Sequence, residues 1–235
     1  MRSNLRARIV AEFLGTAFLV AAVVGSGIMA ERLAGGNVAL ALLANTIATG
    51  AALIALILTF GPISGAHFNP VVSLADAMEG GLAWSEAVYY AAAQILGGVC
   101  GTIAAHAMFA LPLVSLSRHI RSGPAQILSE FIATFGLLSV IWGCSRSRSS
   151  IIPFAVASYI TAAYWFTAST SFANPAVTIA RCLTDTFAGI RPVDVSLFVL
   201  AQIAGGVAAT ILFRWLAPNL PSGARNVVVP HSTES

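Results

Sequence analysis

The chain has 235 residues, of which 57% are hydrophobic and 9% are charged, and its formal net charge at pH 7 is +3. Soluble globular domains carry about 25% charged residues, and with a mean hydropathy of +0.85 this composition excludes a soluble domain and indicates an integral membrane protein. The 12 basic residues are all arginine and form no dense run, so we expect no nucleic-acid partner.

The cysteines and histidines give no sign of a metal site or a disulfide framework. Cys100, Cys144 and Cys182 are far apart and lack CxxC spacing, and the four histidines lack ligand spacing. Cysteines of this kind are usually small apolar packing residues. We therefore expect no metal and no cofactor.

Six apolar runs are each long enough to cross a bilayer, which takes about 20 residues in a helix. In chain order they lie at about 9–29, 38–60, 83–111, 125–144, 151–168 and 193–216. Two further segments, 62–81 and 169–190, are too short and too mixed in composition to span. Irregular backbone at membrane depth is tolerated only inside protein or against water, so we expect both segments to be re-entrant. The polar tail, 218–235, is predicted to be disordered.

The arginines near the first run predict the orientation. Arg2, Arg6 and Arg8 precede this run, and basic residues concentrate on the cytoplasmic side, where the first helix usually dominates. An even number of spans then places both termini in the cytoplasm. We expect a multi-pass protein of the plasma (inner) membrane, surrounded by lipid.

The two halves of the chain resemble each other. Residues 11–16 (AEFLGT) resemble 129–134 (SEFIAT), and residues 94–98 (QILGG) resemble 202–206 (QIAGG). The halves, about 8–111 and 125–216, each hold three spans within a single channel domain over 1–217. Because three is odd, the second half enters the membrane from the opposite side. Such an inverted repeat places solute sites near the bilayer midplane.

Both re-entrant segments contain an Asn-Pro pair, at Asn69-Pro70 and Asn174-Pro175. Asn is a favourable helix N-cap and Pro suits the first helical position, so each pair predicts a short helix that starts abruptly. The inverted repeat would bring the two helices tip to tip, with both asparagines offering side-chain N–H donors at the centre. Their N-termini, each equivalent to roughly +0.5 charge, would oppose cations and protons.

The double Asn-Pro motif resembles that of the aquaporin, or major intrinsic protein, family, and the resemblance covers about 8–216. It implies an all-α membrane fold with six transmembrane helices and two re-entrant half-helices. It also implies a channel, not an enzyme, that is usually a homotetramer and conducts water or small neutral solutes. The central constriction would be formed by two triplets: Asn69, Pro70, Val71 and Asn174, Pro175, Ala176. Val71 departs from the family, which has Ala at that place.

A second departure concerns the outer selectivity filter. The family's usual arginine directly follows the second triplet, where this chain has Val177. Gap-free spacing from the asparagines places the other filter positions at Thr49, Ala162 and Ser171. We therefore expect a small-sided, uncharged and wider outer mouth. Arg181 lies one helical turn after Val177 and is a candidate outer-mouth charge, although we weigh a loop-packing or surface role higher.

An arginine-free filter resembles that of bacterial family members associated with arsenic resistance. This resemblance suggests undissociated metalloid acids such as arsenite as solutes. Glycerol and urea suit the same filter, and water would accompany them. An orthodox water channel is the alternative within the family.

Two acidic residues and one histidine complete the candidate site. Glu12 and Glu130 lie within spans, where carboxylates are costly. The family resemblance implies that each accepts hydrogen bonds from the backbone of a re-entrant loop. The alternative for Glu12 is an interfacial position beside Arg8. His67, two residues before Asn69, would line the inner pore or pack against it.

Two other classes of function remain to be weighed. A secondary active transporter also uses inverted repeats with broken helices, but the chain is short and offers no cluster of ion-coupling carboxylates beyond the two glutamates. A membrane enzyme would need paired carboxylates or a nucleophile–histidine arrangement. Neither lies near the two Asn-Pro motifs, so we expect no catalytic residue.

Overall fold

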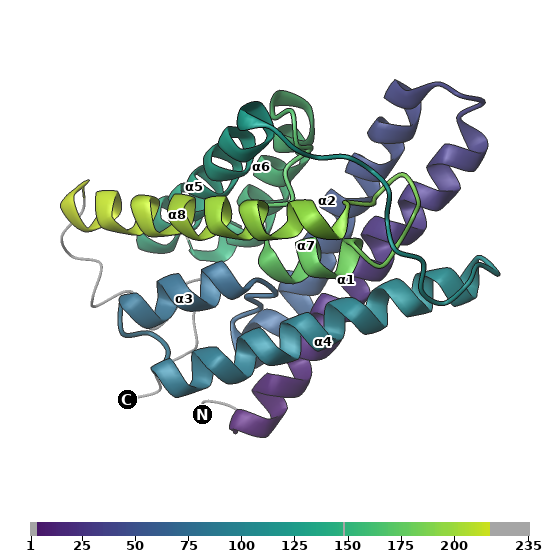
Figure 1. The fold of residues 1–235 in the computed structure, drawn as a ribbon. Helices are drawn as coiled ribbons and strands as arrows, with labels where there is room; N and C mark the ends of the chain where they lie inside the picture. Colours follow the sequence, from purple (N-terminus) through teal and green to yellow (C-terminus); the bar gives the residue numbers. More distant parts are fainter. Residues whose placement is uncertain (1–3, 148, 217–235) are drawn as a thin grey trace.

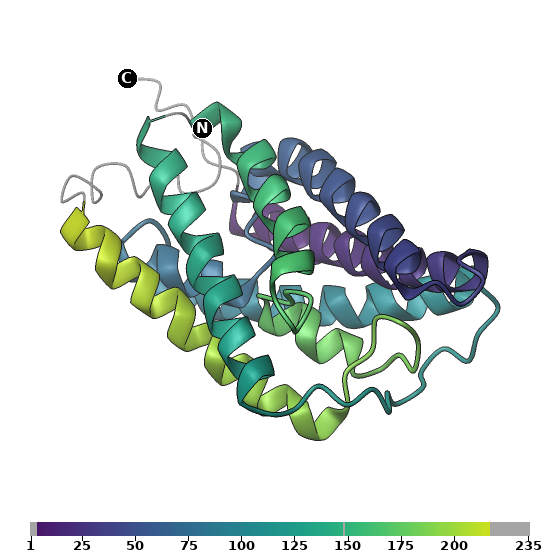
Figure 2. The same cartoon turned by 90° about the horizontal axis from the view of Figure 1, so that it is seen from above.

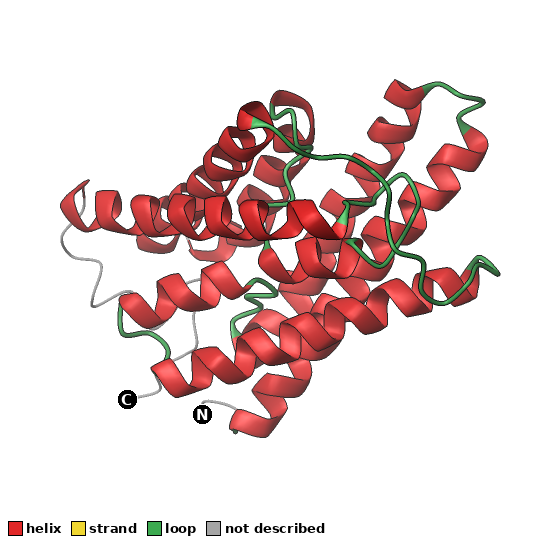
Figure 3. Cartoon of the chain, viewed as in Figure 1, coloured by secondary structure: helices red, strands yellow, loops and turns green. Residues whose placement is uncertain are grey.

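The computed structural model describes residues 4–147 and 149–216, and all regular structure within them is helical (Figures 1 and 3). The predicted all-α membrane fold is confirmed. A single 3-10 turn, Ser149–Ile151, precedes α6. The α-helices are α1 (Leu5–Leu33), α2 (Val38–Ser64), α3 (Pro70–Met78), α4 (Trp84–Met108), α5 (Pro124–Ser147), α6 (Ile152–Phe166), α7 (Pro175–Arg181) and α8 (Pro192–Leu216). The predicted disordered tail, together with Arg2, lies outside the described residues.

Five helices, α1, α2, α4, α5 and α8, are long and apolar enough to cross a membrane by length and composition. The remaining predicted span, at 151–168, is shorter than expected. Helix α6 has 15 residues, which is about 22 Å of helix at 1.5 Å per residue. It ends at Phe166 because the next residue, Thr167, is extended, with φ −108° and ψ 138°.

Helix α2 is longer than predicted and includes Pro62, which we had assigned to a re-entrant segment. The proline lies in the last turn, and Gly65 then ends the helix in the left-handed conformation, with φ 91° and its N–H donated to the carbonyl of Gly61. A left-handed glycine is the usual helix terminator. The re-entrant segment therefore begins only after Ser64.

The two halves repeat one arrangement, seen from two directions in Figures 1 and 2. Helix α1 packs against α2 and α4, and α5 packs against α6 and α8. The half-helices α3 and α7 lie between the halves, since each contacts both α4 and α8. Close packing is also repeated: a Cβ at Gly97 would collide with the carbonyl of Phe13, and one at Gly205 with the carbonyl of Phe131. Small residues let membrane helices approach in this way.

Contacts between helix ends show that the second half is inverted. Arg8, near the start of α1, pairs with Glu86, near the start of α4, at 2.5 Å. Arg214, near the end of α8, pairs with Glu79, just after α3. The start of α1 and the end of α8 are therefore on one surface. The start of α8 is on the opposite one, together with the start of α5, because Arg121, just before α5, donates its N–H to Asp194 at 2.9 Å.

Candidate functional site

The two half-helices begin at their asparagines, as the sequence predicts. Asn69 caps α3, and its Oδ1 accepts a hydrogen bond from the Val71 N–H at 2.9 Å. Asn174 caps α7 and accepts from the N–H groups of Ala176 (3.0 Å) and Val177 (3.3 Å). In both helices proline occupies the first turn, where its missing N–H costs nothing.

The same asparagines tie the two tips together. Asn69 Nδ2 donates to the carbonyl of Ala173, and Asn174 Nδ2 donates to the carbonyl of Phe68, both at 2.7 Å. A side-chain amide nitrogen has two hydrogens, so each asparagine uses one for the tie and keeps one. The structure thus brings the tips together, but half of the donor capacity that we assigned to solute belongs to the fold.

A buried carboxylate holds the first loop. Glu12 is fully buried and accepts hydrogen bonds from the backbone N–H groups of His67 (3.0 Å) and Phe68 (2.7 Å) and from Ser64 Oγ (2.6 Å). Gln94 Nε2 donates to the same carboxylate at 2.8 Å. The interfacial alternative for Glu12 is wrong, because the side chain lies in the interior.

Glu130 does the same for the second loop. It accepts from the N–H groups of Phe172 (2.9 Å) and Ala173 (2.8 Å), and Gln202 Nε2 donates to it at 2.6 Å. Gln94 and Gln202 were missed as site residues. Their signal was present in the sequence, because both open the repeated QIxGG segment.

A cavity of about 70 Å³ lies along the two tips. This is room for a few water molecules. Its polar lining consists of Thr49, His67, Asn69, Tyr164, Ser171, Asn174 and Arg181. Its apolar lining includes Leu19, Val23, Leu53, Ile57, Val72, Leu137, Ile141, Val156, Ile160 and Val177. The wall therefore offers hydrogen-bonding groups and aliphatic surface to the same occupant.

Three of the four predicted filter residues line this cavity, and one does not. Thr49, Ser171 and Val177 belong to the wall, but Ala162 lies on the exposed side of α6. Its assignment is wrong because the lining residue, Tyr164, is two residues closer to Asn174 than the gap-free spacing assumed. The Tyr164 hydroxyl lies 3.3 Å from Thr49 Oγ1. The cavity wall beside Thr49 therefore contains an aromatic ring, so it is not small-sided.

The four predicted filter residues are uncharged, but the cavity wall is not, because Arg181, the candidate charge, lines it. Arg181 is 2% exposed and lines the cavity. Its Nε donates to the carbonyl of Ala188, and its guanidinium carbon lies 3.4 Å from the centre of the Phe172 ring. Arg181 thus packs against a loop, which is the role that the sequence favoured, and it also contributes charge to the wall.

His67 both lines the cavity and packs against α3. Its Nδ1 lies 3.1 Å from Ser73 Oγ, and its Nε2 lies 3.5 Å from a carboxylate oxygen of Asp76. Asp76 was not singled out from the sequence. Among the described residues no group of three or more His, Cys, Asp or Glu side chains is arranged to hold a metal ion.

Comparisons with known proteins identify the family and the fold. The family model described as "Major intrinsic protein" matches residues 1–168. The chain is 55% identical to "Aquaglyceroporin AqpS" of Rhizobium meliloti (strain 1021) over 91% of both chains. It is 32% identical to "Aquaporin A" of Dictyostelium discoideum, over 87% of this chain and 76% of the relative. The structure of the aquaglyceroporin from Plasmodium falciparum has the same fold, with a TM-score of 0.71 at 18% identity over 93% of this chain and 99% of that one.

Proposed function

Because this chain belongs to the major intrinsic protein family, whose members are channels and not enzymes, we propose that it is a passive channel for small uncharged polar solutes such as glycerol and arsenite, with water. The observation that carries the proposal is the mixed wall of the central cavity. Hydroxyl and amide groups replace the water that a polyol or a metalloid acid gives up on entering. The aliphatic residues accept its non-polar parts.

The charges around the cavity favour neutral solutes. Moving an ion out of water is costly unless an opposite charge compensates for it. Among the described residues Arg181 forms no ion pair with a carboxylate, and the two carboxylates nearest the tips, Glu12 and Glu130, accept hydrogen bonds from the loops. A cation that enters therefore meets the Arg181 guanidinium, which has no carboxylate of the described residues paired directly with it.

Two similarities support the choice of solutes. The relative from Rhizobium meliloti is named an aquaglyceroporin, which supports glycerol. Valine at position 177, where the family usually has arginine, resembles members associated with arsenic resistance, which supports arsenite. We propose that Thr49, Tyr164, Ser171 and Val177 form the outer filter and that Arg181 supplies its charge.

Stopped-flow measurements on proteoliposomes test this function. The purified chain should raise the permeability to water, glycerol and arsenite above that of empty vesicles. Val177→Arg should reduce glycerol and arsenite flux more than water flux, because a second guanidinium would narrow the filter. If both proteins pass only water, the chain is an orthodox water channel. If uptake requires an imposed proton gradient, it is an active transporter.

We also propose a homotetramer in the plasma membrane with cytoplasmic termini. Large apolar side chains are exposed along the outer faces of the bundle, for example Phe18, Leu58, Leu96 and Leu200, as lipid or a neighbouring subunit requires. The arginines at the start of α1 favour the cytoplasm for that surface. Cross-linking in native membranes should give a ladder that ends at four subunits, and a terminal tag should be accessible only after permeabilisation.

A further inference from the structure

The long connection between α4 and α5, residues 109–123, lies outside the cavity and packs against the segments that follow α7 and precede α8. It crosses the molecule from α4 to α5 in Figures 1 and 2. Its backbone runs along the segment after α7: Ser115 N donates to the carbonyl of Leu183 and Ser117 N to that of Cys182, both at 3.0 Å. Arg191 N donates to the carbonyl of His119 at 2.8 Å. The connection is therefore fixed against the loop that follows the second half-helix.

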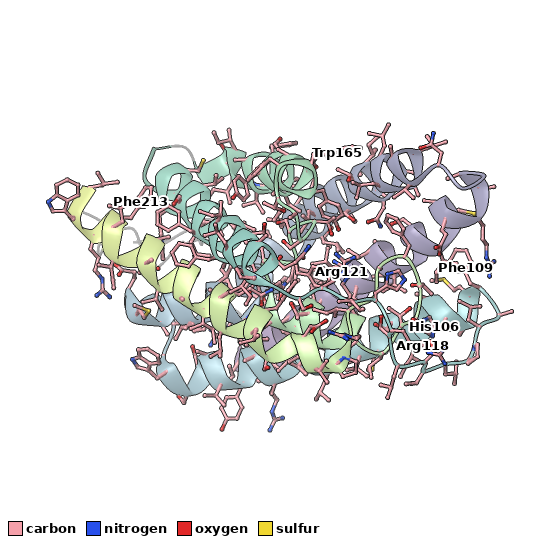
Figure 4. All side chains as sticks on the ribbon, turned by 45° about the horizontal axis from the view of Figure 1, so that its top comes forward. His106, Phe109, Arg118, Arg121, Trp165 and Phe213 are labelled. Carbon is pink, nitrogen blue, oxygen red and sulfur yellow. The ribbon has the colours of Figure 1, made fainter. Side chains whose placement is uncertain are left out.

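Arg121, near the end of this connection, reaches from it into the second re-entrant loop. Its Nε donates to the carbonyl of Gly189 at 2.8 Å, and its NH1 donates to the carbonyl of Ser169 at 3.0 Å and lies 3.5 Å from Thr170 Oγ1. One guanidinium thus joins three separate segments. Figure 4 places Arg121 near the middle of the molecule and Arg118, on the same connection, to one side near His106.

The loop that Arg121 holds is strained in a way that the first loop is not. Four residues before Asn69 the left-handed position is taken by Gly65, with φ 91°. The corresponding residue of the second half is Thr170, with φ 61°, whereas the next position has φ 50° in both loops, at Ala66 and at Ser171. A β-branched residue at positive φ is unusual and persists only where its surroundings enforce it. Arg121 is part of that enforcement, because it contacts Thr170 and the carbonyl before it.

Arg121 also shares an aromatic contact with the charged residue of the pore wall. The guanidinium carbons of Arg121 and Arg181 lie 4.9 Å and 3.4 Å from the centre of the Phe172 ring. A cation over an aromatic face is attracted by the ring quadrupole. Phe172 directly follows Ser171, whose buried hydroxyl lines the cavity and has no hydrogen-bond partner among the described residues. The position of that hydroxyl depends on the strained turn.

We propose that Arg121 is a positioning residue for solute selection: by fixing the 169–172 turn it holds the Ser171 hydroxyl and the Arg181 guanidinium at the outer constriction. This role rests on the proposed channel function and extends it to a residue outside the pore. Ser171 Oγ is a free hydrogen-bonding group that a solute hydroxyl can meet. Loss of Arg121 should therefore lower polyol flux more than water flux, because a small water molecule can reorient toward a displaced Ser171 hydroxyl and a polyol cannot do so as freely.

The experiment compares the ratio of glycerol to water flux per channel in Arg121→Met, Arg121→Lys and the unmodified chain. A loss of folded protein lowers both fluxes together and leaves the ratio unchanged. We expect Arg121→Met to lower the ratio about threefold to tenfold, the change that one hydrogen bond's net free energy corresponds to. Arg121→Lys keeps the charge but not the fork of donors, so its ratio should lie between the two. Arg118→Met is the matched control, since that side chain is 91% exposed on the same connection.

A second-site variant and an exchange measurement complete the test. Thr170→Gly removes the strain at the turn, so Arg121→Met/Thr170→Gly should recover most of the ratio. Hydrogen exchange at residues 169–173 should rise in Arg121→Met alone. A normal ratio in Arg121→Met and Arg121→Lys, with or without faster exchange, overturns the role of Arg121 only. Absence of glycerol flux through the unmodified chain overturns the proposed function and this role together.

Discussion

Asn69 and Asn174 are bonded reciprocally: each donates its side-chain amide to the carbonyl of the residue that precedes the other. The two ties are equal in length, 2.7 Å, and they join loops that enter the membrane from opposite sides. Each asparagine also caps its own half-helix. The two asparagines that the sequence associates with solute therefore also have a structural role: their hydrogen bonds hold the two halves together.

Replacing either asparagine by aspartate should remove one of these two hydrogen bonds and destabilise the contact between the halves. Aspartate keeps the capping oxygen but cannot donate, so Asn69→Asp leaves the carbonyl of Ala173 unpaired and Asn174→Asp leaves that of Phe68 unpaired. A buried unpaired polar group costs about 1–3 kcal/mol. We expect each variant to lower the thermal unfolding midpoint in detergent. Because both ties join the same tips, the double variant should lose less than the sum of the singles; additive losses would show that the ties act independently.

Val71, the departure from the family's alanine, is matched by a glycine on α8. A Cβ at Gly206 would collide with Val71 Cγ1, so Gly206→Ala should destabilise the protein by about 1–3 kcal/mol, the usual cost of overpacking. Val71→Ala in the same chain should restore the unfolding midpoint. Gly143→Ala is the control, because a Cβ at Gly143 would lie 3.8 Å from its nearest neighbour, a Phe213 ring carbon. Failure of Val71→Ala to rescue Gly206→Ala contradicts the proposed pairing.

The glutamines behind the loops should matter as much as the glutamates. Gln94 donates to Glu12 and, at 3.0 Å, to Ser73 Oγ, and Gln202 donates to Glu130 and, at 2.8 Å, to Thr178 Oγ1. Gln94→Met and Gln202→Met keep the volume and remove these donors. Each should lower the unfolding midpoint, by about 1–3 kcal/mol in free energy. Similar losses would support equivalent roles in the two halves, and a neutral effect in both would mean that the backbone donors suffice.

The sequence predicts the site where the relation between residues is local or repeated. Asn69 and Asn174 act as caps because capping depends on the next three residues, and Glu12 and Glu130 stand out because each occurs inside an apolar run. Position along a pore is different, since it depends on the length and path of loops. Ala162 was misplaced for this reason.

The contacts of Arg121 and Arg181 show a second feature that the sequence alone does not reveal. Spacing from Val177 made Arg181 a candidate, but Arg121 stands in the sequence as an ordinary arginine near a loop. Arg121 reaches the second re-entrant loop only because the α4–α5 connection folds across the molecule, and its guanidinium there contacts the same Phe172 ring as that of Arg181. No spacing rule predicts contacts between segments that lie about 50 residues apart or more.

The correction from Ala162 to Tyr164 leads to a direct test of the filter. In a background whose three native cysteines are replaced by serine, Tyr164→Cys and Ala162→Cys should respond differently to a small methanethiosulfonate reagent. The cysteine at 164 would project into a cavity of about 70 Å³, where one added group obstructs the path, so water and glycerol flux should fall. The cysteine at 162 lies on the exposed face of α6, and its modification should leave both fluxes unchanged. Block at position 162 alone would restore the spacing-based filter.

Tyr164→Phe tests the hydroxyl separately. It removes the group that lies 3.3 Å from Thr49 Oγ1 and keeps the ring. We expect it to lower glycerol flux more than water flux, because a polyol loses a hydrogen-bond partner in the cavity wall.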